Sequence, residues 1–222
     1  MAIELIGIRK SYKHKKVLES VSLKVEEGSC VGIIGSNGCG KSTLLSILAG
    51  VQKADGGSFL YQGKDMLNGT LLKTEIVGYV PQGNPLIEEL NAWDNLRMWY
   101  DRKTIRRELS DGVLAMLGID SFLKVPVYKM SGGMKKRLSI GCAVASRPPI
   151  LLLDEPSAAL DIVCKEQIYR YLRNFKEEGG IILLTTHDSQ ELELCDQCYI
   201  LKQGKLIFYK YDGDIHHLAG DL

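Results

Sequence analysis

One segment of the sequence has the residue types and the spacing that bind phosphate groups. It follows the pattern GxxxxGK plus Ser, between an apolar run at residues 30–34 and a helical spacing at residues 42–49. Glycines let the backbone curl until successive N–H groups point at phosphate oxygens, and the following helix N-terminus adds positive charge. Lys41 is predicted to bridge the β- and γ-phosphates of a nucleotide, and the Ser42 hydroxyl to ligate Mg²⁺. The residues predicted to bind the nucleotide are Gly35, Ser36, Asn37, Gly38, Cys39, Gly40, Lys41, Ser42 and Thr43.

Two adjacent carboxylates follow a second apolar run. Asp154 and Glu155 come directly after residues 150–153, which read Ile-Leu-Leu-Leu. Nucleotide hydrolysis requires a carboxylate near the metal ion, and Asp154 is predicted to hold that ion. Because neighbouring side chains at a strand end diverge, Glu155 is predicted to face the attacking water as general base. By itself such a pair is more often a solvated turn, but the upstream phosphate loop favours the catalytic interpretation.

A second anion site is indicated by the sequence Met130-Ser131-Gly132-Gly133-Met134. Ser131 is a favourable N-cap for the helix that the later spacing predicts, and the two glycines leave the first N–H groups of that helix uncovered. Taken alone, the pattern describes an ordinary capped helix. Its position in the sequence, between the phosphate loop and the paired carboxylates, favours the interpretation as a second anion site.

These motifs, in this order and spacing over nearly all of the chain, resemble the nucleotide-binding domain of ABC transporters. The resemblance implies that Tyr12 stacks on adenine, that Gln82 binds magnesium and contacts the attacking water, and that His187 contacts the γ-phosphate. The catalytic residues would then be Lys41, Gln82, Glu155 and His187. The family also completes each nucleotide site in trans, and the matching residues are Ser131, Gly132, Gly133 and Asp161.

Each position that the resemblance adds also has a simpler interpretation. Tyr12 fits a cross-strand aromatic pair, Gln82 a turn residue and His187 the end of a strand. Two residues depart from the family pattern: Met134 stands where glutamine is commonest, and Ala159 stands where glycine is usual. Met134 retains the backbone N–H but removes a side-chain amide, which can alter the contact in trans.

Short apolar runs around the motifs predict a parallel sheet. Residues 30–34, 150–153 and 181–185 have the continuous hydrophobicity that is typical of strands buried on both faces. A further strand is predicted at residues 76–80, and a helix at residues 165–178. This order of strands, loops and helices fits a parallel α/β core.

Three regions depart from the parallel pattern. The first thirty residues read as strands, residues 85–148 are dominated by helical periodicity, and the tail alternates like a hairpin around Gln203-Gly204. We therefore predict an α/β fold with one domain over residues 1–222. Its RecA-like P-loop NTPase core comprises residues 1–84 and 149–222, with an N-terminal antiparallel β region and an inserted helical subdomain at residues 85–148.

Composition and charge narrow the class of protein. The 222 residues carry 28 Lys and Arg against 27 Asp and Glu, and a net charge of +1 gives no electrostatic reason to expect a nucleic-acid partner. The longest apolar runs fall far short of the ~20 residues that span a bilayer, and the N-terminus lacks a signal-peptide pattern. Six cysteines lack the spacing of a disulfide scaffold, and Cys195 and Cys198 are expected to line a core. We therefore expect a cytoplasmic protein.

The resemblance to ABC transporters implies a function as well as a fold. The chain would be a magnesium-dependent ATPase that uses ATP and Mg²⁺ and releases ADP and phosphate. Its partners would be a second copy of itself or a related ATPase subunit and integral membrane permease subunits, with no nucleic acid. It would lie on the inner face of the cell membrane. The Met-Lys-Lys-Arg run from Met134 resembles an exporter variant of the family and favours export of an unknown substrate.

The stretch from Gly83 to Tyr100 is the candidate contact with the membrane subunits, because large apolar residues gather there. Most of these are expected to fill the core of the helical subdomain instead. The alternative function is that of a soluble ABC-type ATPase in iron–sulfur assembly or another remodelling task. DNA-repair relatives insert a long coiled coil between the positions that match Lys41 and Ser131, and a GTPase would need an Asn-Lys-x-Asp motif, so both are disfavoured.

Overall fold

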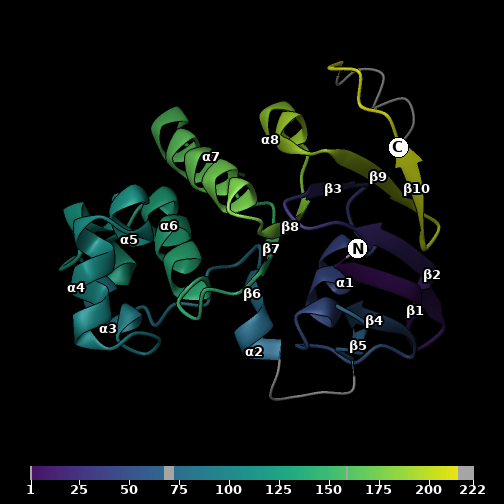
Figure 1. The fold of residues 1–222 in the computed structure, drawn as a ribbon, viewed down its shortest axis with the longest axis horizontal. Helices are drawn as coiled ribbons and strands as arrows, with labels where there is room; N and C mark the ends of the chain where they lie inside the picture. Colours follow the sequence, from purple (N-terminus) through teal and green to yellow (C-terminus); the bar gives the residue numbers. More distant parts are fainter. Residues whose placement is uncertain (1, 68–72, 159, 215–222) are drawn as a thin grey trace.

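A mixed β-sheet lies at the centre of the computed structural model, which describes residues 2–67, 73–158 and 160–214 (Figure 1). Within these residues the sheet has six strands in the order β10-β9-β3-β8-β7-β6. Neighbouring strands run parallel except β9 and β10, which form an antiparallel hairpin. The strands are β3 (Cys30–Ile34), β6 (Val77–Val80), β7 (Ile150–Asp154), β8 (Ile181–Thr185), β9 (Gln197–Lys202) and β10 (Lys205–Tyr209).

Continuous hydrophobicity explains why β3, β7 and β8 occupy the middle of this sheet. Every residue of the three strands is buried, as expected for strands covered on both faces. Leu152 and Leu183 share an apolar cluster with helix α1 (Lys41–Leu48), whereas Leu151 and Leu184 pack in the cluster that contains α6 (Gly132–Ala143) and α7 (Ile162–Glu177). The buried strands predicted from the sequence are therefore confirmed.

The strand predicted at residues 76–80 is shorter than expected. β6 begins at Val77, because Lys73–Ile76 forms the short helix α2. Helix α7 also begins and ends slightly earlier than the sequence predicts. Such shifts at element ends arise because a spacing pattern does not fix where the first or last hydrogen bond forms.

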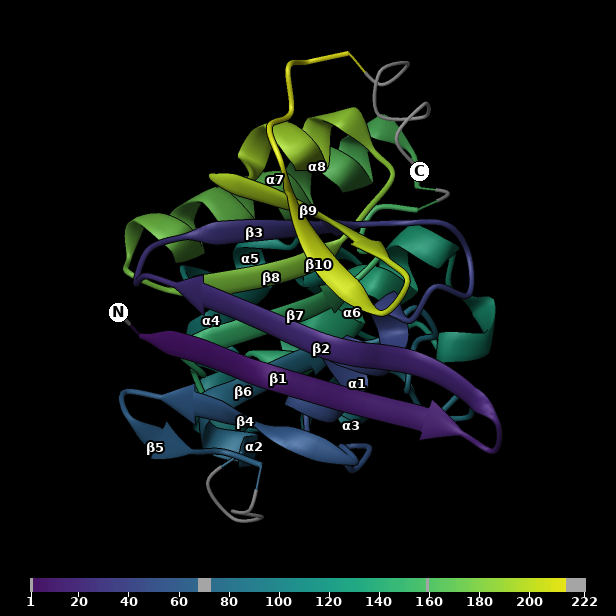
Figure 2. The ribbon, with the colours of Figure 1, turned by 90° about the vertical axis from the view of Figure 1, so that its right-hand side faces the viewer.

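A smaller antiparallel sheet covers α1 (Figure 2). Its strand order is β2-β1-β4-β5. Buried residues of β1, among them Leu5 and Ile8, share an apolar cluster with Leu44 and Leu45 of α1. The predicted N-terminal antiparallel region is thus present, and it helps to hold the helix that follows the phosphate loop. Its strands are β1 (Ile3–Tyr12), β2 (Lys15–Val25), β4 (Gly56–Tyr61) and β5 (Lys64–Asp65).

A group of helices stands on one side of the sheet (Figure 1). Residues 85–148, all of which are described, form helices and turns with one isolated β-bridge between Asn91 and Pro126. The exact bounds of a helical subdomain stay a prediction.

Among the helices of the described residues, none is long and apolar enough to cross a membrane. Besides α1, α2, α6 and α7, the described residues form the helices α3 (Ala92–Leu96), α4 (Arg102–Ser110), α5 (Val113–Met116) and α8 (Ser189–Leu194), with 3₁₀ turns at Ile119–Phe122 and Val127–Lys129.

The six cysteines are free thiols. Cys198 lies in a small apolar cluster with Ile34 and Ile200, and Cys195 packs against it, as the sequence predicts. The Sγ of Cys195 also lies 3.6 Å from the Sγ of Cys30. Cys195 and Cys198 therefore pack with apolar residues and with the buried Cys30.

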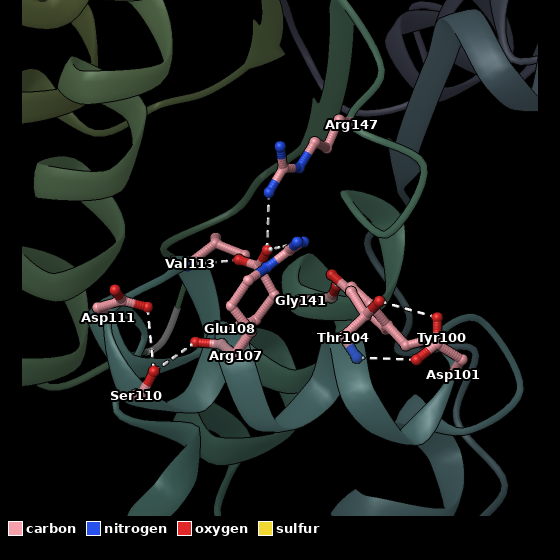
Figure 3. Close-up of polar contacts among 10 residues, drawn as sticks. All are labelled: Tyr100, Asp101, Thr104, Arg107, Glu108, Ser110, Asp111, Val113, Gly141 and Arg147. Carbon is pink, nitrogen blue, oxygen red and sulfur yellow. Dashed lines mark hydrogen bonds and ion pairs between the residues drawn. The ribbon is translucent and has the colours of Figure 1, made fainter.

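A buried carboxylate joins α4 to the segment that returns to the sheet (Figure 3). Glu108 is 6% exposed, and its Oε1 accepts hydrogen bonds from Arg147 at 2.9 Å and from Arg107 at 3.1 Å. Its Oε2 accepts a hydrogen bond from the Val113 N–H at 3.1 Å. Burial raises the pKa of Glu108, but these three donors outweigh it and leave the pKa below the ordinary value.

We expect Glu108→Gln to lower the free energy of unfolding by about 1–3 kcal/mol at pH 7, because it removes the negative charge that Arg107 and Arg147 contact and replaces one acceptor oxygen by an NH2 group. Since the folded state lowers this pKa, the stabilisation is complete above about pH 4.3 and disappears as the pH falls through the lower folded pKa. Chemical denaturation across this pH range measures the difference. The matched control is Glu166→Gln, because the exposed Glu166 pairs with Arg173 at 3.1 Å and should contribute under ~1 kcal/mol. Equal losses for the two variants would contradict the assignment.

Candidate nucleotide-binding and hydrolysis site

The phosphate-loop motif forms the turn between β3 and α1. β3 runs between β8 and β9, so the start of the loop is held by the sheet. Gly40 caps α1 with a φ of 115°, and a Cβ there would lie 2.7 Å from Cγ1 of Val17, so the position requires glycine. Among the described residues, no side chain caps α1 and its first turn holds no acidic residue. Its first N–H groups and its partial positive charge are therefore available to bind an anion.

The side chain of Lys41 folds into the loop and is 6% exposed. Its Nζ donates hydrogen bonds to the carbonyl oxygens of Gly35 at 2.6 Å and Ser36 at 3.4 Å. The same nitrogen lies 3.2 Å from Nε2 of His187, which follows β8. The fold thus brings together two residues, 146 positions apart, that the sequence analysis assigns to the same phosphate group.

Asp154 and Glu155 lie at the end of β7, and Thr185 of β8 bonds to the side chain of the first and to the backbone of the second. Asp154 is 2% exposed, and its Oδ1 accepts a hydrogen bond from Thr185 Oγ1 at 2.6 Å. The N–H of Glu155 donates to the Thr185 carbonyl oxygen at 3.1 Å. Glu155 has a φ of 48°, an uncommon conformation for a residue with a side chain, and the chain turns sharply there. Asp154 is thus buried against Thr185, and the chain leaves the strand at Glu155.

Gln82 follows β6, the strand next to β7. Its Nε2 donates a hydrogen bond to Oε2 of Glu155 at 3.0 Å. Because the amide nitrogen faces Glu155, the amide oxygen is the atom that can serve as a metal ligand. Oxygen atoms of Ser42, Asp154 and Gln82 are of the type that Mg²⁺ prefers, an ion usually held by one or two carboxylates together with substrate phosphates. The donor set therefore fits a magnesium–nucleotide complex.

The pKa of His187 is lowered from its ordinary value. Partial shielding from water is the largest cause, and the nearby Lys41 ammonium lowers the pKa further, while Glu155 raises it. These effects favour the neutral imidazole near pH 7. A neutral Nε2 can accept a hydrogen bond from Lys41.

Tyr12 is the last residue of β1, and it is 43% exposed. Its hydroxyl donates to Oε1 of Gln52, and the Lys10 ammonium lies 5.5 Å from its ring centroid. The residue opposite Tyr12 on β2 is Lys15, so the cross-strand aromatic pair considered from the sequence is not formed there. The exposed ring can stack on a base.

Ser131 caps α6 and begins the second candidate anion site. Its Oγ accepts a hydrogen bond from the Met134 N–H at 3.2 Å. Gly133 packs so closely on α7 that a Cβ would lie 2.5 Å from Sγ of Cys164, whereas Gly132 is exposed. The nearest atom to a Cβ at Gly132 would be Cδ2 of Leu160, at 4.0 Å. The glycine turn thus adjoins the segment before α7 in the same chain.

That neighbouring segment, residues 157–161, ends at the N-cap of α7. Asp161 accepts a hydrogen bond from the Cys164 N–H at 2.9 Å, which lowers its pKa. Ser157 is buried and accepts a hydrogen bond from the Tyr169 hydroxyl at 3.1 Å. The same hydroxyl lies 3.3 Å from Oδ1 of Asp188, the residue after His187. Ala159, where the sequence departs from the family pattern, lies outside the described residues.

The sequence analysis missed two residues of this site. Thr185 was recognised only as the end of a strand, and its contacts with Asp154 and Glu155 cross between strands. Lys136 is 5% exposed although it belongs to a Lys-Lys-Arg run, which usually forms a solvated surface. The one signal in the sequence that Lys136 could be buried is its position three residues after Gly133, which places the two residues on the same face of a helix.

Comparison with known proteins identifies the family. The family model described as ABC transporter matches residues 18–158. Nod factor export ATP-binding protein I of Sinorhizobium fredii is 35% identical over 93% of this chain and 62% of that relative. Spermidine/putrescine import ATP-binding protein PotA of Mesoplasma florum is 32% identical over 92% of this chain and 60% of that relative. The chain therefore spans about three fifths of the length of these two relatives.

A shorter relative and a solved structure match over nearly their whole length. Lantibiotic transport ATP-binding protein SrtF of Streptococcus pyogenes is 31% identical over 95% of this chain and 92% of that protein. The solved structure is described as a dimeric post-hydrolysis state of the ATP-binding cassette MJ0796 bound to ADP and phosphate. It superposes with a TM-score of 0.84 at 28% identity, covering 94% of this chain and 98% of that one. By sequence and by fold, this chain belongs to the ABC transporter family.

Proposed function

We propose that this chain is an ATP-binding and ATP-hydrolysing subunit that powers transport of a substrate through separate membrane subunits. The observation that carries the proposal is the pair of contacts at the carboxyl edge of the sheet. Lys41 lies within hydrogen-bonding distance of His187 there, and Gln82 donates a hydrogen bond to Glu155. A phosphate-binding lysine, a neutral histidine, a carboxylate and an amide side chain are the groups that hydrolysis of a nucleotide requires.

Each residue has a role that its surroundings support. Lys41 and the N–H groups at the start of α1 bind the phosphates, and the exposed ring of Tyr12 stacks on adenine. Glu155 accepts a proton from the attacking water, and Gln82 orients both the carboxylate and the water. His187 is neutral and contacts the γ-phosphate. Ser42, Asp154 and Gln82 would hold Mg²⁺, which supplies positive charge to the phosphates when it is bound.

A second copy of the chain, or a related ATPase subunit, is proposed to complete each site. The surface formed by Ser131, Gly132, Gly133 and Asp161 would contact the nucleotide of the opposite subunit. Exposure of Gly132 and the closely packed Gly133 support this role, because they leave the N-terminus of α6 accessible to an anion. The similar cassette described as a dimer with ADP and phosphate gives further support.

The membrane subunits are proposed to contact a cavity between the helical region and the sheet. It has a volume of 510 Å³, and α4, α5, α7 and residues 144–149 contribute to its walls. Tyr171 and Phe175 provide an apolar wall, and Glu108 and Arg147 provide charge. We propose a short helix from a cytoplasmic loop of a membrane subunit as the occupant. Such a helix can cover apolar walls while its polar side chains face the charged residues.

The stretch from Gly83 to Tyr100 contributes only partly to this proposed contact. Tyr100 lines the cavity, and Trp99 is 63% exposed, so these two are the candidates for touching the partner. Leu86 and Trp93 pack against the apolar core of the helical region. Contact with membrane subunits would place the chain on the inner face of the cell membrane.

Export is the favoured direction of transport, although similar proteins include both exporters and importers by their descriptions. The support is the run that begins at Met134, which resembles the exporter variant of the family. Because the Met134 N–H already bonds to Ser131 Oγ, the side chain is not required for the cap. The identity of the substrate depends on the membrane subunits.

We expect Lys41→Ala to abolish ATP binding and Glu155→Gln to retain it while lowering turnover about 100-fold or more, since the second change removes only the proton acceptor. Steady-state phosphate release and binding of a fluorescent ATP analogue measure the two effects. Glu166→Gln, the same change at an exposed position of α7, is the control and should leave both unchanged. Near-normal turnover by Glu155→Gln would remove Glu155 as the general base.

The pKa of His187 provides an independent test of the site. We expect its ring protons to titrate below about pH 6.5 in NMR spectra, because shielding and Lys41 both lower the pKa. Glu155→Gln should lower the midpoint further, since it removes the group that raises this pKa. The signal that disappears in His187→Ala assigns the resonance. A midpoint at or above the ordinary value, or an upward shift in Glu155→Gln, would contradict the arrangement.

A further inference from the structure

Lys136 is a buried cation that contacts the segment containing Gln82. It lies on α6, five positions after the helix cap Ser131, and it is 5% exposed. Its Nζ donates hydrogen bonds to the carbonyl oxygen of Pro81 at 3.1 Å and to that of Gln82 at 3.3 Å. The side chain therefore connects α6 to the backbone that leaves β6.

These two carbonyl groups lie outside the hydrogen bonds of the sheet. β6 pairs with β7 only as far as Val80, so Pro81 and Gln82 lie beyond the ladder of strand hydrogen bonds. The Lys136 ammonium is buried and needs hydrogen-bond acceptors, and the two carbonyl oxygens supply them. The contact therefore satisfies the ammonium and holds the backbone of this turn against α6.

Nearby carboxylates help to keep the ammonium charged. Burial lowers the pKa of Lys136, whereas attraction to Asp154, Glu191 and Glu155 opposes that change. Lys136 thus lies within the field of the carboxylates that the proposed mechanism assigns to the metal ion and to the attacking water. A methionine side chain, which is similar in length, would provide neither the charge nor the two hydrogen bonds.

The side chain of Gln82 makes the position of its backbone important. Its Nε2 must reach Oε2 of Glu155, at 3.0 Å in the structure, and a small displacement of the turn would break that contact. Helix α6 also begins with the Ser131 turn, so Lys136 holds Gln82 at a fixed distance from that turn through one rigid element. The neighbouring Lys135 differs, because its Nζ contacts Glu88 at 3.3 Å instead.

We propose that Lys136 is a positioning residue for ATP hydrolysis, which holds the Pro81-Gln82 backbone so that the Gln82 side chain reaches Glu155. The proposal rests on the ATPase function proposed above. It gives α6 two roles: its N-terminus forms the anion-binding turn, and its second turn sets the geometry of Gln82 in the same chain. Helix α6 and the hydrolytic residues are then mechanically linked.

The test compares Lys136→Met with Lys135→Met, the same change at the next residue of the helix. Lys136→Met should lower kcat about tenfold with the KM for ATP within about twofold, because a misplaced Gln82 affects the chemical step more than binding. Lys135→Met should behave as wild type. Lys136→Arg, which retains the charge and several N–H donors, should restore kcat to within about threefold of wild type.

A double-mutant cycle with Gln82→Ala separates positioning from general stability. If Lys136 acts through Gln82, Lys136→Met should lower kcat less than about twofold in the Gln82→Ala protein. A tenfold loss that persists undiminished in that background would overturn the proposal, as would equal kcat values for the two Met variants. Thermal unfolding checks that every variant is folded at the assay temperature. If Lys136→Met is not folded, Lys136→Gln takes its place in the same cycle.

The two proposals fail in different ways. Wild-type protein without ATPase activity, alone and with its membrane subunits, would contradict the proposed function. Active wild-type protein in which Lys136→Met matches Lys135→Met would contradict only the role of Lys136.

Discussion

Burial of the central strands on both faces determines where polar groups can lie in this fold. β3, β7 and β8 carry almost no polar side chains along their length, because every residue in them is covered by apolar clusters. Polar groups that do chemistry must then follow the strands, where the backbone turns out of the sheet. Parallel pairing places those turns at one edge. Lys41, Gln82, Glu155 and His187 meet there although they are far apart in the sequence.

That edge also has an electrostatic pattern that suits a phosphate ligand. Positive charge comes from Lys41 and the uncapped start of α1, which follow β3, while Asp154 and Glu155 lie at the end of β7, on the other side of β8. The lowered pKa of His187 disfavours a second cation next to Lys41. The proposed contact cavity, in contrast, lies near Pro149 and Gly180, just before β7 and β8 begin. Nucleotide and membrane partner would therefore act at opposite ends of the same strands.

The sequence predicted those parts of the site that depend on local pattern. Gly40 and Lys41 are recognisable because a phosphate loop requires fixed spacing between a strand and a helix, and Asp154 because it follows an apolar run. Lys136 and Glu108 were not recognised, because their hydrogen-bond partners lie up to 55 positions away and their burial depends on how the helices pack. The start of β6 was misplaced by one residue for a similar reason, since periodicity does not show where α2 ends. Residues whose role depends on a local sequence motif could be predicted, whereas residues whose role depends on contacts between distant segments could not.

We propose above that each nucleotide site is completed by the Ser131-Gly132-Gly133 turn of an opposite subunit. Sedimentation velocity of the Glu155→Gln protein with and without ATP is the decisive measurement, because bound ATP that is not hydrolysed should hold two subunits together. We expect a monomer or weak dimer without ATP and a stable dimer with it. Adding Gly132→Asp should abolish the dimer while each chain still binds ATP, since the aspartate places negative charge against the phosphate. A dimer equally stable with and without ATP, or one that survives Gly132→Asp, would contradict this proposal, because a ligand with no preference between two states cannot shift them.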